Sequence, residues 1–140
     1  MKRFILILIL ASCAINAQSW NSVITTNINS SNIEYIENHA NKDGIHIVTF
    51  DYSDDIKYYL INYSGATVRS STISTSGKFP NIVGDESGIY VVYKEGSNIR
   101  VKKTSDAGAN WTQGPDQSIG SNPCSGIDAV VNEDGIHVVW

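Results

Sequence analysis

Three closely spaced aspartates, Asp51, Asp54 and Asp55, are carboxylates whose type and spacing could do chemistry in this 140-residue chain. Carboxylate oxygens are preferred ligands of Ca²⁺, and pairs of carboxylates hydrolyse glycosidic bonds. Their spacing matches no calcium-binding loop, however, and aspartate is common in turns between strands. We therefore interpret the three residues as a solvated hairpin turn and predict no metal site, no cofactor and no catalytic residue there.

A second pattern of spaced residues is Thr104-x-Asp106-x-Gly108-x-x-Trp111. A short carboxylate such as Asp106 can accept hydrogen bonds from backbone N–H groups of its own loop. Gly108 can adopt a left-handed conformation, and Trp111 can bury a large ring. The pattern predicts a loop with a structural role rather than a catalytic acid.

An internal repeat organises the chain around these residues. The segment at 41–50 recurs at 85–93 and at 132–140, and its turn glycines are Gly44, Gly88 and Gly135, separated by 44 and 47 positions. In each copy a polar turn ending in glycine precedes a run of β-branched and aromatic residues, which is typical of a hairpin and a buried strand. The period is that of four-stranded propeller blades, roughly 40–50 residues each.

Histidines occupy the same position in two copies of the repeat, at His46 and His137, and Tyr90 holds that position in the other copy. Because tyrosine replaces histidine without changing the pattern, we expect this side chain to pack or to form a local hydrogen bond rather than to bind a metal.

Further strands can be placed around the repeats, among them one at 56–62 and an outer strand at 67–73. They predict one complete unit at 33–76, a second at 80–120 and the start of a third at 125–140, with an outer strand of the second unit from Trp111 onward. We expect residues 20–29 to form a strand that closes the ring against the last unit.

The repeat period and the Thr104–Trp111 motif together resemble the Asp-box (BNR) repeats of sialidase-like β-propellers. The resemblance implies an all-β fold, here a partial propeller of about two and a half four-stranded antiparallel blades, and hence the N-terminal fragment of a longer protein. In that family the Asp-box lies away from the substrate face. The corresponding turn of the first unit, residues 63–67, lacks both the aspartate and the tryptophan.

Sialidase activity in that family implies three arginines that hold the substrate carboxylate, a Tyr–Glu pair and an aspartate. The early Arg-Ile-Pro motif of the family is absent, and Arg69 and Arg100 lie in predicted outer and third strands. We therefore expect a non-catalytic module that binds a glycan or an extracellular protein. The alternative is the N-terminal part of an exo-sialidase or related glycoside hydrolase whose catalytic residues lie mostly beyond Trp140.

Composition argues against binding of nucleic acid, since the net charge is −4 and clustered basic residues are missing. Lys2 and Arg3 precede an apolar run at 4–10, and the small Ala17 ends a signal peptide at 1–17. This predicts secretion or display at a bacterial surface. Alternatively, the segment 10–13 is a lipobox, so that Cys13 would be lipidated and would anchor an outer-membrane lipoprotein. After cleavage at Ala17 only Cys124 remains, which excludes an internal disulfide.

Overall fold

The computed structural model describes residues 28, 32–121 and 123–140, which form an all-β structure of antiparallel strands in three sheets. Sheet 1 contains β1 (Ile33–Asn41), β2 (Gly44–Asp51), β3 (Ile56–Ile61) and β4 (Thr67–Ser74), in that order. Sheet 2 contains β5 (Gly77–Asp85), β6 (Gly88–Glu95), β7 (Asn98–Thr104) and β8 (Thr112–Gln113), and β9 (Gln117–Ser118) also pairs with β7. Sheet 3 is the hairpin of β10 (Asp128–Asn132) and β11 (Gly135–Val139). The predicted all-β antiparallel class is thus confirmed.

The signal peptide expected at 1–17, with Cys13, and nearly all of the strand expected at 20–29 lie outside the described residues. Within the part of the chain that the structure describes, no helix is long and apolar enough to cross a membrane.

The three copies of the sequence repeat are three equivalent hairpins at the starts of the sheets. Gly44 pairs with Asn41, Gly88 with Asp85 and Gly135 with Asn132, each across a two-residue turn, and the glycine φ angles are 138°, 148° and 125°. A Cβ atom on Gly44 would lie 2.4 Å from the backbone oxygen of Ile61, and one on Gly88 would lie 2.2 Å from that of Thr104. Glycine is therefore required in the first two hairpins by the positive φ and by the close approach of the third strand.

Two hydrophobic cores separate the three sheets. Side chains of β2, β3, β5 and β6, including Tyr58 and Val91, form the core between sheets 1 and 2. Val92, Ile99, Ile119 and Ile127 form the core between sheets 2 and 3, and partly buried residues of sheet 3 pack against it. Strand β6 is thus buried on both faces, which explains its nearly continuous apolar sequence.

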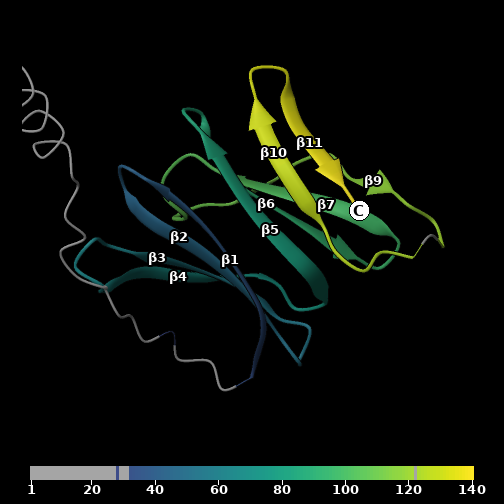
Figure 1. The fold of residues 1–140 in the computed structure, drawn as a ribbon, viewed down its shortest axis with the longest axis horizontal. Helices are drawn as coiled ribbons and strands as arrows, with labels where there is room; N and C mark the ends of the chain where they lie inside the picture. Colours follow the sequence, from purple (N-terminus) through teal and green to yellow (C-terminus); the bar gives the residue numbers. More distant parts are fainter. Residues whose placement is uncertain (1–27, 29–31, 122) are drawn as a thin grey trace, which may run out of the picture.

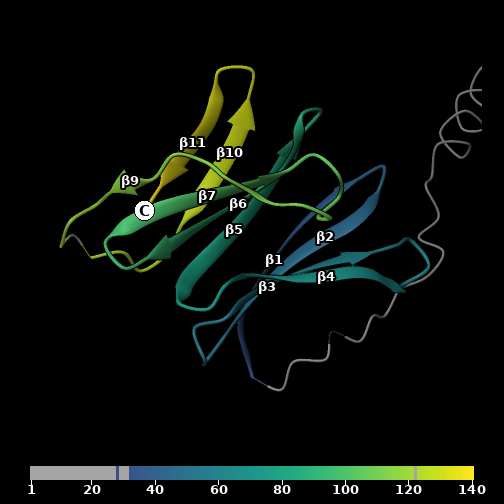
Figure 2. The ribbon, with the colours of Figure 1, turned by 180° about the vertical axis from the view of Figure 1, so that it is seen from behind.

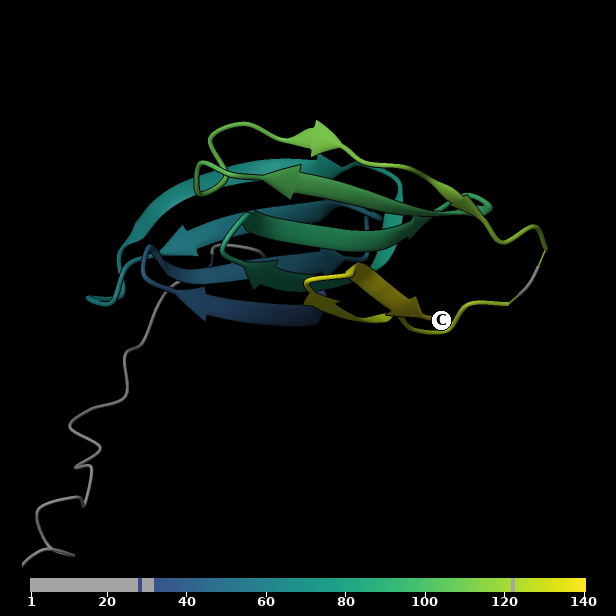
Figure 3. The same ribbon diagram turned by 90° about the horizontal axis from the view of Figure 1, so that it is seen from above.

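The first strands of the sheets lie on one side of the molecule. Strand β5 contacts β1 and β2 of sheet 1 and also β10 of sheet 3. Figures 1 and 2 show the three sheets side by side in chain order, and Figure 3 shows β1, β5 and the β10–β11 hairpin along one side with β4 on the other. The last strands and the loops that precede them therefore lie together, which positions the candidate site.

The outer strand of sheet 2 differs from the single strand expected after Trp111. It consists of two short segments, β8 and β9, which pair with opposite ends of β7. Pro115 lies between them and has no N–H to donate to a ladder, and the Gly114 N–H instead donates to Val101 O at 2.8 Å. Proline thus divides the strand.

Candidate functional site

Residues 104–111 form the loop between β7 and β8, called here the Asp-box loop. Thr104 Oγ1 donates a hydrogen bond to Asp106 Oδ1 at 2.6 Å, and the Gly108 N–H donates to Thr104 Oγ1 at 2.9 Å. Asn110 donates through its backbone N–H to Asp106 Oδ1 at 2.9 Å and through Nδ2 to Oδ2 at 2.7 Å. These hydrogen bonds, from Thr104 first and then from Asn110, hold the pKa of Asp106 well below its usual range. An ionised carboxylate with both oxygens engaged is suited to stabilising a loop, not to donating a proton.

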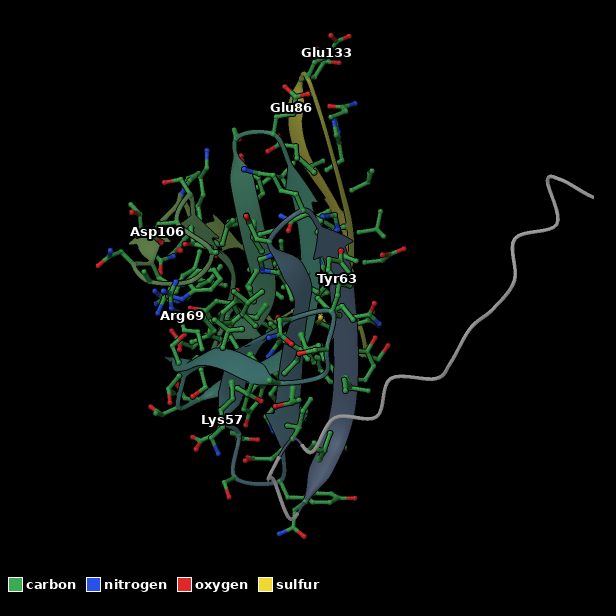
Figure 4. The ribbon with its side chains drawn as sticks, turned by 90° about the vertical axis from the view of Figure 1, so that its left-hand side faces the viewer. Lys57, Tyr63, Arg69, Glu86, Asp106 and Glu133 are labelled. Carbon is green, nitrogen blue, oxygen red and sulfur yellow. The ribbon has the colours of Figure 1, made fainter. Side chains whose placement is uncertain are left out.

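The Asp-box loop also contacts sheet 1. Arg69 of β4 donates through Nη1 to Asp106 O at 2.9 Å and to Ala107 O at 3.0 Å, and Figure 4 shows Arg69 directed toward the loop that carries Asp106. Gly108 has a φ of 83°, and an added Cβ there would lie 2.2 Å from Tyr58 Cε1. The loop therefore needs glycine for its conformation and for its contact with the Tyr58 ring.

Trp111 completes this junction between the sheets. Its ring meets the Tyr58 ring edge to face, with centroids 5.0 Å apart and planes inclined by 74°, a favourable aromatic geometry. Its Nε1 donates to Ser71 Oγ of β4 at 3.1 Å. Thr104, Asp106, Gly108 and Trp111 thus act together, with the aspartate shaping the loop and the last two residues joining it to sheet 1.

The equivalent turn of sheet 1 is organised by Asn62, which the sequence interpretation overlooked. Asn62 Oδ1 accepts from the Ala66 N–H at 2.9 Å, as Asp106 Oδ1 accepts from Asn110, and Asn62 O accepts from the Gly65 N–H at 2.9 Å, as Asp106 O accepts from Ala109. Asn62 lies 44 positions before Asp106, the same interval as from Gly44 to Gly88. That interval was the signal that could have identified it.

Next to this junction lies a buried chain of polar side chains around His46. His46 Nδ1 is 2.7 Å from the Tyr58 hydroxyl, and Nε2 is 2.9 Å from Asn41 Oδ1. Burial lowers the pKa of His46, with a further contribution from His39. Because Asn41 Oδ1 can only accept, His46 Nε2 carries the proton of this contact. The Tyr58 hydroxyl lies between His46 Nδ1 and Ala107 O, which is 3.2 Å away, and so links His46 to the Asp-box loop. His46 therefore supports Tyr58, on which the Asp-box loop rests.

The other two hairpins form local hydrogen bonds at the same positions. In sheet 2, the Ser87 hydroxyl lies 2.7 Å from Asp85 Oδ1 and 2.6 Å from the Tyr90 hydroxyl. In sheet 3, His137 Nε2 lies 3.2 Å from Asn132 Oδ1. The aromatic side chain at this repeated position thus forms a hydrogen bond with a residue of its own hairpin turn.

A polar cleft of about 400 Å³ opens between sheets 1 and 2, beside the Asp-box loop. Its walls come from the β1–β2 hairpin, the β5–β6 hairpin and the start of the loop. The charged residues of its lining are Asp43, Asp85, Glu86 and Lys42, joined by His39 and the hydroxyls of Ser87 and Ser105. Figure 4 shows Glu86 at the same end of the molecule as Glu133 and opposite to Lys57. Lys42 Nζ lies 4.0 Å from Asp43 Oδ1, and Lys103 Nζ lies 3.1 Å from Ser87 Oγ at the edge of the lining. The three carboxylates therefore leave a small net negative charge, which favours cations and hydroxyl groups.

The aspartates of the β2–β3 turn lie away from the cleft. Asp51 Oδ1 accepts from the N–H groups of Ser53 at 3.0 Å and Asp55 at 3.2 Å, and Asp51 Oδ2 is 3.2 Å from Lys57 Nζ. Asp54 is 3.1 Å from Lys78 Nζ. Across residues 28, 32–121 and 123–140, no group of three or more potential ligands is arranged to hold a metal ion. These aspartates organise a turn and its ion pairs.

Arg100, the other arginine considered from the sequence, lies within ion-pair distance of Glu95 at 2.7 Å and of Asp116 at 3.3 Å. Arg69 is bound to the Asp-box loop, so the structure does not bring the two side chains to one site. Cys124, a free thiol, lies beside the core between sheets 2 and 3.

Comparisons of the chain with protein-family models, with curated proteins and with solved structures find no match.

Proposed function

We propose that the chain forms blade units of a sialidase-like β-propeller that acts outside the cell as a non-catalytic binding module. The equivalent hairpins, the stacked antiparallel sheets and the common side taken by their first strands support the propeller. The apolar leader supports export, with attachment to the outer membrane if Cys13 is lipidated.

The acidic cleft between sheets 1 and 2 is the observation that supports the proposed binding function. Asp43, Asp85 and Glu86 come from two different hairpins and face one space of about 400 Å³, within the usual size range of small-ligand pockets. Their charges favour Lys or Arg side chains of an extracellular protein as the ligand. The Ser87 and Ser105 hydroxyls favour a neutral glycan as the second candidate, since carboxylates and hydroxyls bind sugar hydroxyl groups.

An exo-sialidase remains the alternative proposal, but its substrate carboxylate would be repelled by this cleft. Arginine is the side chain that binds a carboxylate through two parallel hydrogen bonds, and Arg69 is engaged by the Asp-box loop. Hydrolysis of sialyllactose by the full chain would favour this alternative.

The cleft proposal can be tested by titrating the full chain with a hexalysine peptide while recording amide NMR spectra. The double variant Asp43→Asn/Glu86→Gln removes two charges but leaves Asp85, which accepts the Ser87 and Gly88 N–H groups, in place. We expect roughly 3- to 30-fold weaker binding, from the usual strength of exposed ion pairs. Glu133→Gln/Asp134→Asn, in the equivalent turn of sheet 3, is the matched control and should leave the affinity unchanged.

Two results would contradict a basic ligand: no shifts in the cleft, or equal losses in both double variants. Maltohexaose titrated in parallel tests the glycan ligand, whose binding should depend much less on salt concentration.

A further inference from the structure

A buried chain of hydrogen-bonding groups connects the two walls of the acidic cleft. Asn41 and Asp43 line the cleft from the β1–β2 hairpin, and Ala107 lines it from the Asp-box loop. His46 and Tyr58, both 0% exposed, lie between these walls. Asn41 Oδ1 is 2.9 Å from His46 Nε2, and His46 Nδ1 is 2.7 Å from the Tyr58 hydroxyl. That hydroxyl is in turn 3.2 Å from Ala107 O, so three consecutive contacts join the walls.

Both ends of this chain can only accept hydrogen bonds. One end, Ala107 O, is a backbone carbonyl. At the other end the Asp43 N–H donates to Asn41 Oδ1 at 2.9 Å, which fixes the orientation of the Asn41 amide and directs its oxygen toward His46. Three contacts between two terminal acceptors need three protons. With His46 neutral the chain holds only two, one on the ring and one on the Tyr58 hydroxyl, so one contact lacks its proton.

One added proton on His46 completes the chain. An imidazolium ring has an N–H group on both nitrogens, so Nε2 donates to Asn41 and Nδ1 donates to the Tyr58 oxygen. The Tyr58 O–H is then free to donate to Ala107 O. The same proton places a positive charge next to Asn41 of the cleft lining, where the carboxylates leave a small net negative charge. Protonation therefore changes both the bonding of the walls and the charge of the cleft.

The charged groups around His46 influence the pH at which it binds this proton. His39 of β1 faces it with ring centroids 6.4 Å apart and opposes protonation, whereas the carboxylate of Asp43 in the hairpin favours it. Farther along the chain are Arg69 of β4 and Asp106 of the Asp-box loop, which have opposite charges. Burial is the largest influence and lowers the pKa of His46, so the proton is bound below about pH 6.5.

We propose that His46 is a proton switch for the cleft: its protonation completes the hydrogen-bond chain between the two walls and adds a positive charge beside the acidic lining, so that a bound basic segment is released as the pH falls below neutral. The release of a ligand rests on the binding function proposed above, whereas the chain and its proton do not. The cleft therefore binds at neutral pH and releases in mildly acidic surroundings.

NMR spectra of the full chain between pH 7.5 and 5.0 test the switch without any ligand. The imidazole signals of His46 report its protonation, and the amide signal of Gly108 reports hydrogen bonding at the preceding carbonyl, Ala107 O. In the wild type both should follow one titration curve. Tyr58→Phe keeps the ring but removes the hydroxyl, so the Gly108 signal should no longer follow His46. His137→Gln, which changes the histidine at the equivalent position of sheet 3, is the matched control and should behave like the wild type.

Three results of these titrations would overturn the switch. The first is a His46 ring that stays neutral down to pH 5.0. The second is a Gly108 signal that does not follow His46 in the wild type, and the third is one that still follows it in Tyr58→Phe.

Titration with the hexalysine peptide at pH 7.5 and 5.5 tests the release. The protein carries His39→Gln, because His39 lines the cleft and its own proton would also repel the peptide. In this background we expect roughly 3- to 10-fold weaker binding at the lower pH, and His46→Gln should remove most of that loss. An undiminished loss with His46→Gln would overturn release by His46. Absence of hexalysine binding at either pH would overturn the binding function and with it the release, while the amide titrations alone decide the switch.

Discussion

The Asn62 turn of sheet 1 and the Asp-box loop of sheet 2 stand at equivalent positions and use the same local hydrogen bonds, yet their surroundings differ. In both, a side-chain oxygen accepts from the N–H four residues later. Positive φ angles occur at Gly65 in the first turn but at Ala107 and Gly108 in the second. The second loop alone of the two has a Trp packed on the neighbouring sheet, with Arg69 bound to its carbonyl groups. An amide or carboxylate can thus build the turn, while separate residues join the sheets.

Loss of the Trp111 ring should have the largest effect on the free energy of unfolding if Trp111 joins the two sheets as described. Trp111→Ala removes the contact with Tyr58 and the hydrogen bond to Ser71, so we expect a loss of about 2–4 kcal/mol of unfolding free energy, somewhat below the range for a fully buried Trp. Thr67→Ala, at the equivalent position of the first unit, should change it by less than about 0.5 kcal/mol. Urea denaturation measures both, and similar losses would contradict the comparison.

A methyl group at Gly108 should have the next largest effect. Gly108→Ala combines a positive φ with a Cβ that would clash with the Tyr58 ring, and we expect a loss of about 2–3 kcal/mol. Gly96→Ala is the control for backbone strain alone, because Gly96 has a φ of 57° and nothing within 4 Å of its added Cβ. Its expected loss is about 1 kcal/mol. Equal losses would mean that contact with Tyr58 contributes nothing.

The smallest effect concerns the His46 support beneath Tyr58. Burial lowers the folded-state pKa of His46, so the unfolded chain binds a proton more readily. The contribution of neutral His46 to the free energy of unfolding is therefore fully present above about pH 6.5. It falls as the pH drops toward the folded-state pKa, by at most about 1.4 kcal/mol per pH unit. Urea denaturation at pH 7.5 and 5.5 should show this loss in the wild type and a smaller loss in His46→Gln. His137→Gln, at the equivalent exposed position, should retain the wild-type pH dependence.

Much of the strand pattern could be predicted from the sequence because it depends on short-range chemistry. The run expected at 56–62 forms β3 at Ile56–Ile61, and the outer strand expected at 67–73 forms β4 at Thr67–Ser74. β-Branched and aromatic residues bounded by polar turns favour strands wherever they pack. The break in the outer strand at Pro115 could also have been predicted from the sequence, since proline cannot donate to a ladder, but a single strand was expected there.

The candidate site was less accessible to sequence reasoning. Asp43, Asp85 and Glu86 have the composition of ordinary turn residues, and nothing local shows that two turns 44 positions apart face one cleft. The same holds for Arg69, whose partners Asp106 and Ala107 lie nearly 40 positions away on a neighbouring sheet.

The sequence by itself determined the antiparallel strands, the repeat interval and the residues able to build each turn, since φ preferences and side chain-to-backbone hydrogen bonds act within a few residues. Tertiary structure alone decided that Trp111, Arg69 and Tyr58 meet and that the hairpin carboxylates share a cleft. These features depend on how the sheets stack, which is set by the summed packing of many distant side chains rather than by any single segment.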